Sequence, residues 1–230
     1  MDRNTVIENV RYWQERIGEA SAKWGGCEIC AVSKTVDAEI VNFAYEAGIR
    51  TIGENRVQEL TAKHEALHPE FKRHIIGALQ TNKVKYLIGC ADMIQSVDRD
   101  ALAEEISRRA AAQDTVMPVL VQVNIAKETQ KSGIYEEELL PFLKRCAALP
   151  GIEVKGLMSI MPFADDPEEI RPYFRQMRAW FERIRDLNME NISMNMLSMG
   201  MSSDCIVAAE EGATMVRLGR SIFGARPKKI

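Results

Sequence analysis

The sequence predicts a single (β/α)8 barrel, and three observations support this fold class. Short apolar runs alternate with helical patterns along the chain, in about eight repeats, which is the element order of such a barrel. The 230 residues come close to the roughly 250 that are typical of the fold. An open doubly wound sheet is the structural competitor, but the Gly-rich fingerprint that it needs after its first strand is not present.

The expected strands are short and mostly continuous in apolar residues, as is typical of strands that are buried on both faces. In chain order they are EICAV (28–32), IRTIG (49–53), HIIG (74–77), MIQSV (93–97), VLVQVNI (119–125), VKGLMSI (154–160), MNMLSMG (194–200) and TMVRLG (214–219). No Pro/Gly/Ser-rich linker or charge block divides the series, so residues 1–230 are expected to form one domain.

Helical patterns precede and separate these runs. Residues 1–20 are predicted to form an amphipathic helix, with one apolar face made by Ile7, Val10, Trp13 and Ile17. A second helix is expected between an N-cap at Asp37 and a C-terminal cap at Gly48. The clearest pattern covers 170–187, where apolar residues recur at helical spacing: Ile170, Phe174, Met177, Phe181 and Ile184. Pro167 suits the start of that helix, but Pro172 suits it too, so the position of the first turn is not determined.

Composition and charge narrow the possible functions. Hydrophobic residues make up 46% of the chain and charged residues 27%, as in ordinary globular proteins. A net charge of −3 and a pI of about 5.8 argue against a broad nucleic-acid-binding surface. No run approaches the roughly 18 apolar residues of a membrane span, and the N-terminus lacks the apolar core of a signal peptide. We therefore expect a cytoplasmic protein without membrane or nucleic-acid partners.

The five cysteines do not form a disulfide framework. Cys27 and Cys30 match the C-x-x-C spacing of zinc and redox sites. No second close Cys/His pair accompanies them, however, and Cys30 falls inside an expected strand. The favoured interpretation is ordinary reduced cysteines without a metal site.

Lys34 carries the first signal of chemistry. Function in such barrels gathers at the C-terminal ends of the strands, and Lys34 directly follows the first expected strand. Partial desolvation there should lower the pKa of its amine, and a neutral amine can form a Schiff base with a carbonyl. A surface lysine in a loop is the alternative.

The last two expected strands end in loops suited to phosphate, which these barrels often bind after strands seven and eight. The seventh ends in SMGMSSD and the eighth in RLGRSIFG. Close backbone approach, helix capping and positive charge would come from Gly200, Ser202, Ser203, Gly219 and Arg220. Either loop alone could be only a cap or a turn. Together with a Schiff-base lysine they indicate a phosphorylated aldehyde.

Arg217 lies in the last apolar run, two residues before Gly219, so both are expected to point towards the barrel mouth. A buried arginine is costly unless it has a partner. The partner is either a structural carboxylate or the ring nitrogen of pyridoxal 5′-phosphate (PLP), for which an arginine is a known arrangement.

The chain closely resembles the pyridoxal phosphate homeostasis protein family, whose barrel is of the alanine racemase N-terminal type. The motifs that carry the resemblance are AVSKT (31–35), GENRVQE (53–59), HIIGALQTNK (74–83), SVD (96–98), QVNIAKETQKSGI (122–134), GLMSIMP (156–162), LSMGMSSD (197–204) and VRLGRSIFGAR (216–226). They cover nearly the whole chain in order, and their combination is highly specific.

The resemblance implies that Lys34 holds PLP as an internal aldimine. It implies that Arg217 faces the pyridine nitrogen and that Asn55 lies near the ring. The phosphate would be held by Ser202, the backbone of Met201, and Gly219 with Arg220. Many relatives have tyrosine in place of Arg56 and serine or threonine in place of Arg220. The second departure removes a hydroxyl that could bind phosphate, for which Ser221 or the Arg220 guanidinium would have to compensate.

Other polar or sulfur-containing residues are assigned structural roles. His74, at the expected start of the third strand, is interpreted as structural rather than as an acid–base group. Lys131 is interpreted as a solvated lysine in a loop at the same face. The methionines from Met189 to Met215 are expected to fill the core.

The residues alone indicate a cofactor-binding site. The resemblance further implies a role in intracellular PLP (vitamin B6) and amino-acid homeostasis. We expect no dedicated catalytic turnover, because racemases of this barrel type carry an added domain and a tyrosine base that are not expected here. The partners would be PLP and candidate PLP-requiring apo-enzymes, and the chain is expected to be a monomer. A PLP-dependent racemase of low activity and a cofactor-free aldolase using Lys34 remain the alternatives.

Overall fold

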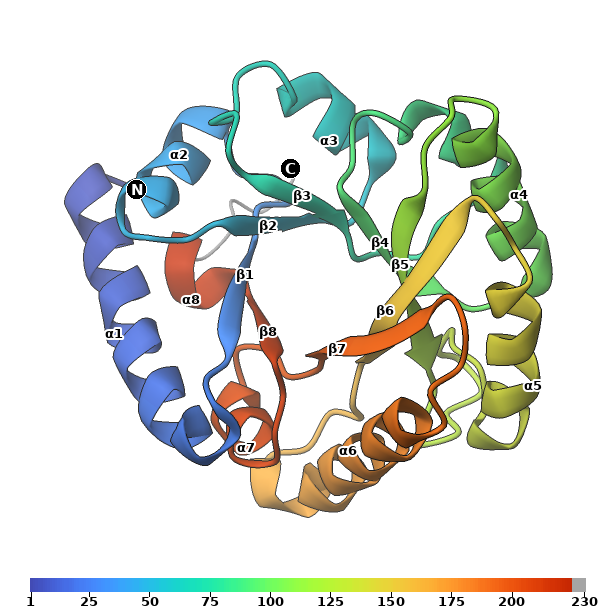
Figure 1. Cartoon of the computed structure of the whole chain (residues 1–230). Coiled ribbons are helices and arrows are strands. Elements are labelled where there is room, and N and C mark those ends of the chain that lie inside the picture. Colours follow the sequence, from blue (N-terminus) through green and yellow to red (C-terminus); the bar gives the residue numbers. More distant parts are fainter. Residues whose placement is uncertain (225–230) are drawn as a thin grey trace.

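The computed structural model describes residues 1–224 of the chain. Eight parallel strands form a closed barrel in the order β1 to β8, and helices surround it (Figure 1). The predicted (β/α)8 fold is therefore confirmed. The last six residues of the predicted domain 1–230, including Ala225 and Arg226 of the eighth family motif, lie outside the described residues.

The strands lie close to the predicted runs, with shifts of a few residues at some ends. They are β1 (Glu28–Val32), β2 (Thr51–Glu54), β3 (Lys72–Ile75), β4 (Met93–Val97), β5 (Met117–Val123), β6 (Ile152–Ser159), β7 (Ile192–Ser198) and β8 (Met215–Leu218). Pairing of β8 with β1 closes the barrel, with Cys30 opposite Arg217. This register places the end of the last strand beside the end of the first.

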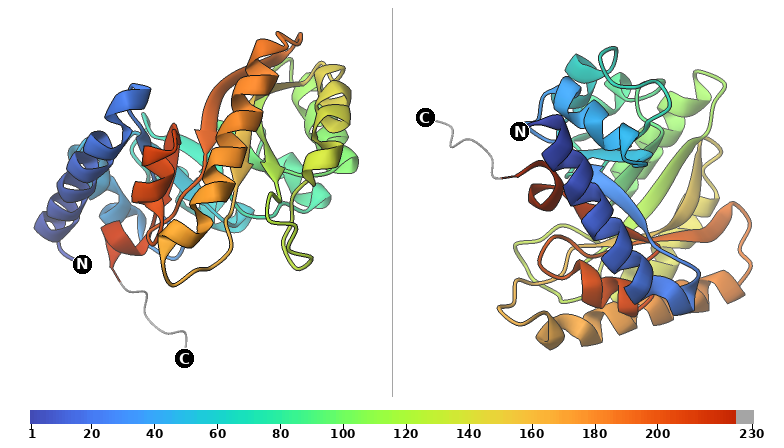
Figure 2. Two further views of the ribbon diagram at one scale, coloured as in Figure 1. Left: turned by 90° about the horizontal axis from the view of Figure 1, so that it is seen from below. Right: turned by 90° about the vertical axis from the view of Figure 1, so that its left-hand side faces the viewer.

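The α-helices alternate with the strands around the outside. They are α1 (Arg3–Ser21), α2 (Ala38–Glu46), α3 (Val57–Lys63), α4 (Asp100–Ala111), α5 (Glu136–Ala147), α6 (Arg171–Asp186), α7 (Cys205–Glu210) and α8 (Arg220–Phe223). Short 3₁₀ helices are η1 (Ala22–Trp24), η2 (Thr81–Tyr86) and η3 (Pro167–Ile170). Since α7 and α8 are short, α1 packs against both and against α2, and so covers that side of the barrel (Figure 2).

The helix predictions hold with two refinements. All five apolar positions predicted for the clearest helix are buried, and Pro167 starts the preceding 3₁₀ turn while Pro172 lies in the first turn of α6. The prediction for α1 was wrong at Ile7, which is half-buried, because the neighbouring Val6 faces the core with 0% exposure. Asp37 is the N-cap of α2, as predicted.

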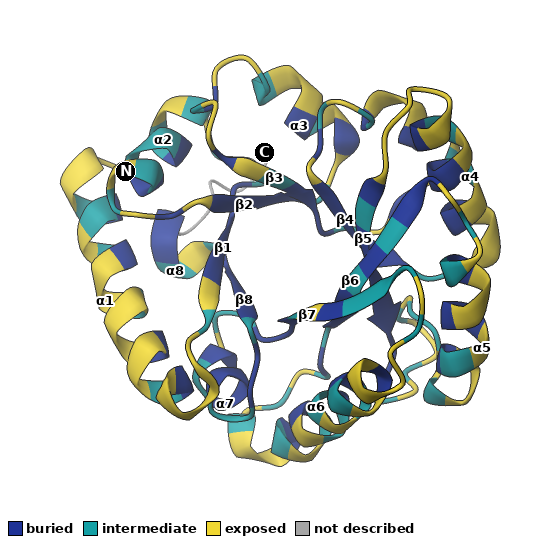
Figure 3. Ribbon diagram, in the orientation of Figure 1, coloured by how far each residue is buried: buried dark blue, intermediate teal, exposed yellow. Residues whose placement is uncertain are grey.

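Apolar side chains form two separate layers of the core. The strands are largely buried, whereas the helices alternate between buried and exposed positions (Figure 3). The larger layer lies between the strands and the helices. A smaller set fills the barrel interior: Cys30, Val32, Met93, Ile76, Leu120, Met158 and Met215. Gly53 belongs to this interior, because a Cβ there would lie 2.9 Å from the Cys30 Sγ and Ile76 Cδ1 atoms. Met194, Met199 and Met215 are buried as predicted.

Candidate functional site

A cavity of about 350 Å³ lies at the barrel mouth where the strands end. Four of the predicted cofactor-binding residues line it, namely Lys34, Asn55, Met201 and Arg217. They follow or belong to four different strands and are brought together only when the barrel closes. The C-terminal end of the barrel is where such folds place their chemistry, as the sequence predicted.

The backbone just before Lys34 is held by a buried ionic network. The Ser33 hydroxyl donates to Glu54 Oε1 at 2.8 Å, and Lys63 Nζ donates both to Glu54 Oε1 and to the Ser33 carbonyl, each at 2.8 Å. Glu54 and Ser33 are fully buried. Strand alternation turns the Ser33 and Glu54 side chains away from the barrel interior, and the next residue after Ser33, Lys34, lines the mouth cavity.

The residue after Lys34 is held as well. Thr35 has a φ of 62°, a left-handed conformation that is uncommon for a residue other than glycine. Its N–H donates to Glu59 Oε2 at 2.8 Å, and Glu59 lies on α3 with Lys63. The helix α3 thus fixes the turn that carries Lys34 from both sides.

The charge of Glu54 is only partly compensated by its neighbours in this network. Its Oε2 atom is buried and has no hydrogen-bond partner in the described part of the chain. Burial raises the pKa of Glu54 above its ordinary value, and the Lys63 ammonium and Ser33 hydroxyl oppose that shift. Sequence reasoning missed both Glu54 and Lys63, although a glutamate directly after an apolar run was a usable signal.

Arg217 is almost fully buried, with 4% of its surface exposed. Its Nη1 atom donates to the carbonyl and hydroxyl oxygens of Ser198, both at 2.8 Å, and Nη2 donates to the Ser159 carbonyl at 2.7 Å. Burial lowers the pKa of Arg217 to about 10, so the guanidinium stays charged near neutral pH. Within residues 1–224 no carboxylate lies within ion-pair distance of it, which disfavours the alternative of a structural carboxylate partner.

A line of polar side chains continues from Arg217 into the barrel. The Ser198 hydroxyl donates to Gln95 Oε1 at 2.7 Å, and Gln95 Nε2 lies 2.8 Å from His74 Nδ1. His74 is 3% exposed, and burial lowers its pKa to about 3, so the ring is neutral. Because His74 does not line the mouth cavity, the structural interpretation of this histidine is supported.

The loop after β7 is organised by an aspartate. The Met201 N–H donates to Asp204 Oδ1, and Asp204 is also the N-cap residue of α7. Burial raises the pKa of Asp204. The sequence assigned capping to Ser202 or Ser203, which was wrong, because Asp204 immediately precedes the helix. Ser202 is half-buried and is not among the residues that line the mouth cavity.

The loop after β8 lies beside the mouth rather than in it. Gly219 and Arg220 line a neighbouring cavity of about 190 Å³, whose wall also includes Thr35. Val32 lines both cavities, so they lie on either side of one strand end. The side chain of Arg220 is exposed, as is that of Arg56 after β2.

The mouth cavity contains residues that sequence reasoning assigned elsewhere or missed. Gln122, Ser132 and Ile160 line it, and so does Lys131. The interpretation of Lys131 as a solvated lysine was wrong, because its Nζ atom donates to the Met161 carbonyl at 2.9 Å and its side chain is 28% exposed. A glutamine inside the apolar run of β5 was the available signal for this part of the site.

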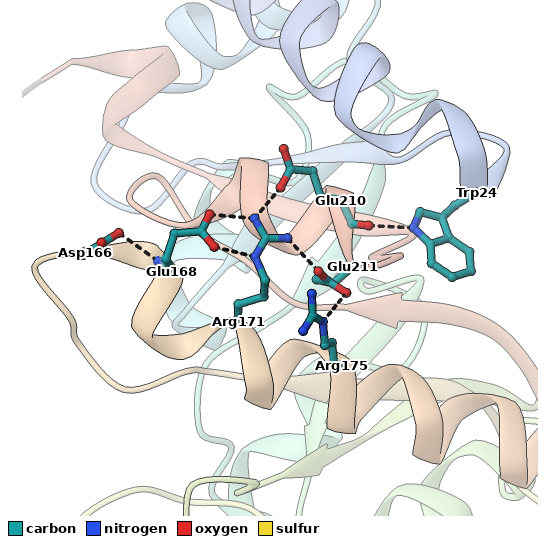
Figure 4. Close-up of polar contacts among 7 residues, drawn as sticks. All are labelled: Trp24, Asp166, Glu168, Arg171, Arg175, Glu210 and Glu211. Atoms are coloured by element: carbon teal, nitrogen blue, oxygen red, sulfur yellow. Dashed lines mark hydrogen bonds and ion pairs between the residues drawn. The ribbon is translucent and has the colours of Figure 1, made fainter.

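An ionic cluster on the outer surface ties the loop after β6 to α7 (Figure 4). Arg171, at the start of α6, contacts Glu168, Glu210 and Glu211 at 2.5–2.6 Å. These carboxylates raise the pKa of Arg171 above its ordinary value. Glu210 ends the short helix that Asp204 begins. The cluster therefore anchors the C-terminal end of α7, the helix that follows the Met201 loop.

Other kinds of site are less supported. Residues 1–224 contain no group of three or more His, Cys, Asp or Glu side chains that could hold a metal ion. The five cysteines are free thiols, and burial raises the pKa of Cys30 to about 12. No helix among the described residues is long and apolar enough to cross a membrane.

Comparisons with known proteins agree with this geometry. The family model for the alanine racemase N-terminal domain matches residues 1–227. A pyridoxal phosphate homeostasis protein of Aquifex aeolicus is 46% identical over 217 residues, covering 92% of this chain and 94% of that protein. The same protein name is carried by a 34% identical relative from Escherichia coli K12, with 97% of each chain covered.

A solved structure of a relative contains the cofactor. PipY of Synechococcus elongatus, with PLP bound, has a TM-score of 0.85 and 32% identity, covering 95% of this chain and 100% of that one. The matched residues span the strands and loops that form the mouth cavity. The chain therefore belongs to the alanine racemase N-terminal domain family and, within it, to the pyridoxal phosphate homeostasis proteins.

Proposed function

We propose that this protein binds PLP covalently through Lys34 and acts in intracellular PLP and amino-acid homeostasis without a dedicated catalytic turnover. One observation carries the proposal. Arg217 is a buried, charged guanidinium that has no ion pair among the described residues, and it lines the same cavity as Lys34. Its hydrogen bonds to Ser198 and Ser159 use three of its five N–H donors, so an acceptor nitrogen on a bound ring could take one of the others. The relative with bound PLP supports the same assignment.

The residues divide the work of binding. With PLP bound, Lys34 would hold its aldehyde carbon as a Schiff base, with release of water. Arg217 would donate to the ring nitrogen and, because arginine stays protonated, would leave that nitrogen unprotonated. An unprotonated ring withdraws electrons more weakly than a protonated one, although racemases of the same barrel type also tolerate an arginine at this position.

Asn55 lines the mouth and is proposed to lie against the ring. For the phosphate we propose Ser202, the Gly219 backbone and Arg220, which stand after β7 and β8. The Met201 N–H already donates to Asp204, so it becomes a phosphate donor only when that aspartate turns away.

The mouth cavity also bears on catalysis. Among the described residues that line it there is no tyrosine, histidine, cysteine, aspartate or glutamate. A two-base racemisation needs a second acid–base group across from Lys34. Besides Lys34 and the charged Arg217, Lys131 is the ionisable side chain in the lining, and it contacts the Met161 carbonyl and the Glu128 carboxylate. A racemase of low activity, the alternative, would have to use Lys131.

The remaining assignments rest on the family alone. We propose that residues 1–230 act as a single-domain monomer in the cytoplasm. We also propose that the protein passes PLP on to PLP-requiring apo-enzymes. The homeostasis name of the relatives supports a role in handling the cofactor.

The first test is chemical trapping. Protein saturated with PLP is reduced with borohydride and digested, and the pyridoxyl group is located by peptide mass. We expect it on Lys34, with Lys34→Ala colourless and Lys131→Ala still yellow. An adduct confined to other lysines, or no visible band at saturation, would refute the proposal. Sustained inversion of an amino acid that disappears in both lysine variants would instead support the racemase.

A further inference from the structure

Four polar side chains cross the interior of the barrel in one line. Arg217, Ser198, Gln95 and His74 come from β8, β7, β4 and β3, and each is at most 4% exposed. Their surroundings are apolar, including Met93 and Met215 of the interior core. Buried polar groups in such a place are retained only when their hydrogen bonds are complete.

The direction of every hydrogen bond in this line follows from Arg217 together with the orientation of the Gln95 amide, whose Nε2 atom also donates to Met215 Sδ at 3.4 Å. A guanidinium donates and never accepts, so the Ser198 hydroxyl oxygen accepts from Nη1 and its own proton points to Gln95 Oε1. In this orientation the Gln95 amide nitrogen faces His74, so Nδ1 accepts from it at 2.8 Å. The His74 proton is consequently on Nε2.

The environment of His74 agrees with a neutral ring. Burial lowers its pKa to about 3, and the Lys72 ammonium on the same strand acts in the same sense. The ring lines a second cavity of about 640 Å³ at the opposite end of the barrel. The charged residues that line this cavity are Glu28, Lys72 and Asp92. Its Nδ1 side faces Gln95, with Arg217 further along the line.

We propose that Gln95 and His74 are positioning residues for Arg217. By fixing the Ser198 hydroxyl as an acceptor, they fix the plane of the guanidinium that meets the cofactor ring. This step rests on the proposed function, whereas the proton position on His74 follows from the protein alone. Neither residue lines the mouth cavity, so both act through Ser198.

Nuclear magnetic resonance of ¹⁵N-histidine protein tests the line without any cofactor. The chain has 3 histidines, and His74→Asn assigns the relevant signals. We expect His74 to show a protonated Nε2, an unprotonated Nδ1 and no titration between about pH 5 and 9. A protonated Nδ1, or titration near the ordinary histidine pKa of 6.5, would overturn the assignment.

Gln95→Glu is the sharpest variant because it keeps the shape of the side chain. The carboxylate still accepts from Ser198, but it offers His74 an oxygen in place of an N–H donor. We expect the His74 proton to move to Nδ1, or the ring to become charged. Unchanged His74 signals in this variant would mean that Gln95 does not determine the tautomer, and the proposal would fail.

Gln95→Met measures the effect on the cofactor. Losing the acceptor for the Ser198 hydroxyl should weaken PLP binding roughly fivefold, as for one hydrogen bond between neutral groups, and shift the visible band. Ser107→Ala is the matched control, since it also removes one buried hydrogen bond, to the Gly151 N–H. Wild-type affinity and an unshifted band in folded Gln95→Met would refute positioning. Failure of wild-type protein to take up PLP would refute the proposed function instead.

Discussion

Replacing Lys63 by methionine should expose how the turn at Lys34 is held. Lys63 is the counterion of Glu54, whose side chain is 0% exposed, while Lys63 itself is 15% exposed. Without the ammonium, Glu54 either remains charged and unpaired or takes up a proton. Removing one partner of a buried pair costs roughly 3–5 kcal/mol. Protonation of Glu54 limits this loss of stability, because it removes the unpaired charge.

The limit can be worked out from the ordinary pKa of glutamate, 4.5. If Glu54 is neutral in the folded variant, folding at pH 7 costs about 3.4 kcal/mol, which is 2.5 pKa units at about 1.36 kcal/mol each. At pH 5 the same cost is only about 0.8 kcal/mol. The sign follows because the folded variant binds a proton that the unfolded chain releases above pH 4.5. Its stability therefore falls as pH rises.

Urea unfolding at pH 7 and pH 5, followed by tryptophan fluorescence, measures these differences. Lys144→Met is the control, because Lys144 lies on α5, is exposed and shares no ion pair among the described residues. The double variant Glu54→Gln with Lys63→Met should recover much of the loss at pH 7. A loss below about 1 kcal/mol at pH 7, or an equal loss at both pH values, would refute the reasoning.

Four further predictions concern stability. Because burial depresses the pKa of His74, the unfolded chain binds its proton first, so wild type should lose about 2 kcal/mol more stability than His74→Asn between pH 7.5 and 5; parallel pH profiles would contradict this. Gly156→Ala should destabilise by at least about 3 kcal/mol in urea, since φ is 151° and the new Cβ would lie 1.8 Å from the Met196 carbonyl oxygen. Gly18→Ala in α1 meets no atom within 4 Å and should stabilise by about 0.5–1 kcal/mol. Arg171→Gln should lose about 1–2 kcal/mol and speed amide exchange in α7, whereas wild-type exchange would show that the cluster does not anchor that helix.

The strands show how far local patterns reach. EICAV and MIQSV were predicted with both ends correct, because each is a short, largely apolar segment of strand length. The second strand extends to Glu54, one residue beyond the predicted run. A glutamate is a poor candidate for a buried strand until its partners are known. Those partners, Ser33 and Lys63, lie 21 and 9 residues away.

The roles inside the barrel show the same limit. Gln95 was visible as a polar residue in an apolar run, but its function depends on Ser198, 103 residues later. Lys131 was placed at the correct face yet assigned to solvent, because its contact with the Met161 carbonyl spans 30 residues. Local sequence cannot encode such distances.

The sequence by itself determined the barrel, the end of it that carries the chemistry, and the meeting of Lys34 with Arg217 in one cavity. These follow from repeat order, strand alternation and family motifs, each of which can be recognised in short segments of the sequence. Only the tertiary structure decided that α3 holds the Lys34 turn, that Asp204 takes the Met201 N–H, and that Gly219 lies beside the mouth. Those features depend on which loops and helices meet when β8 pairs with β1, and closure of the barrel is a property of the whole chain.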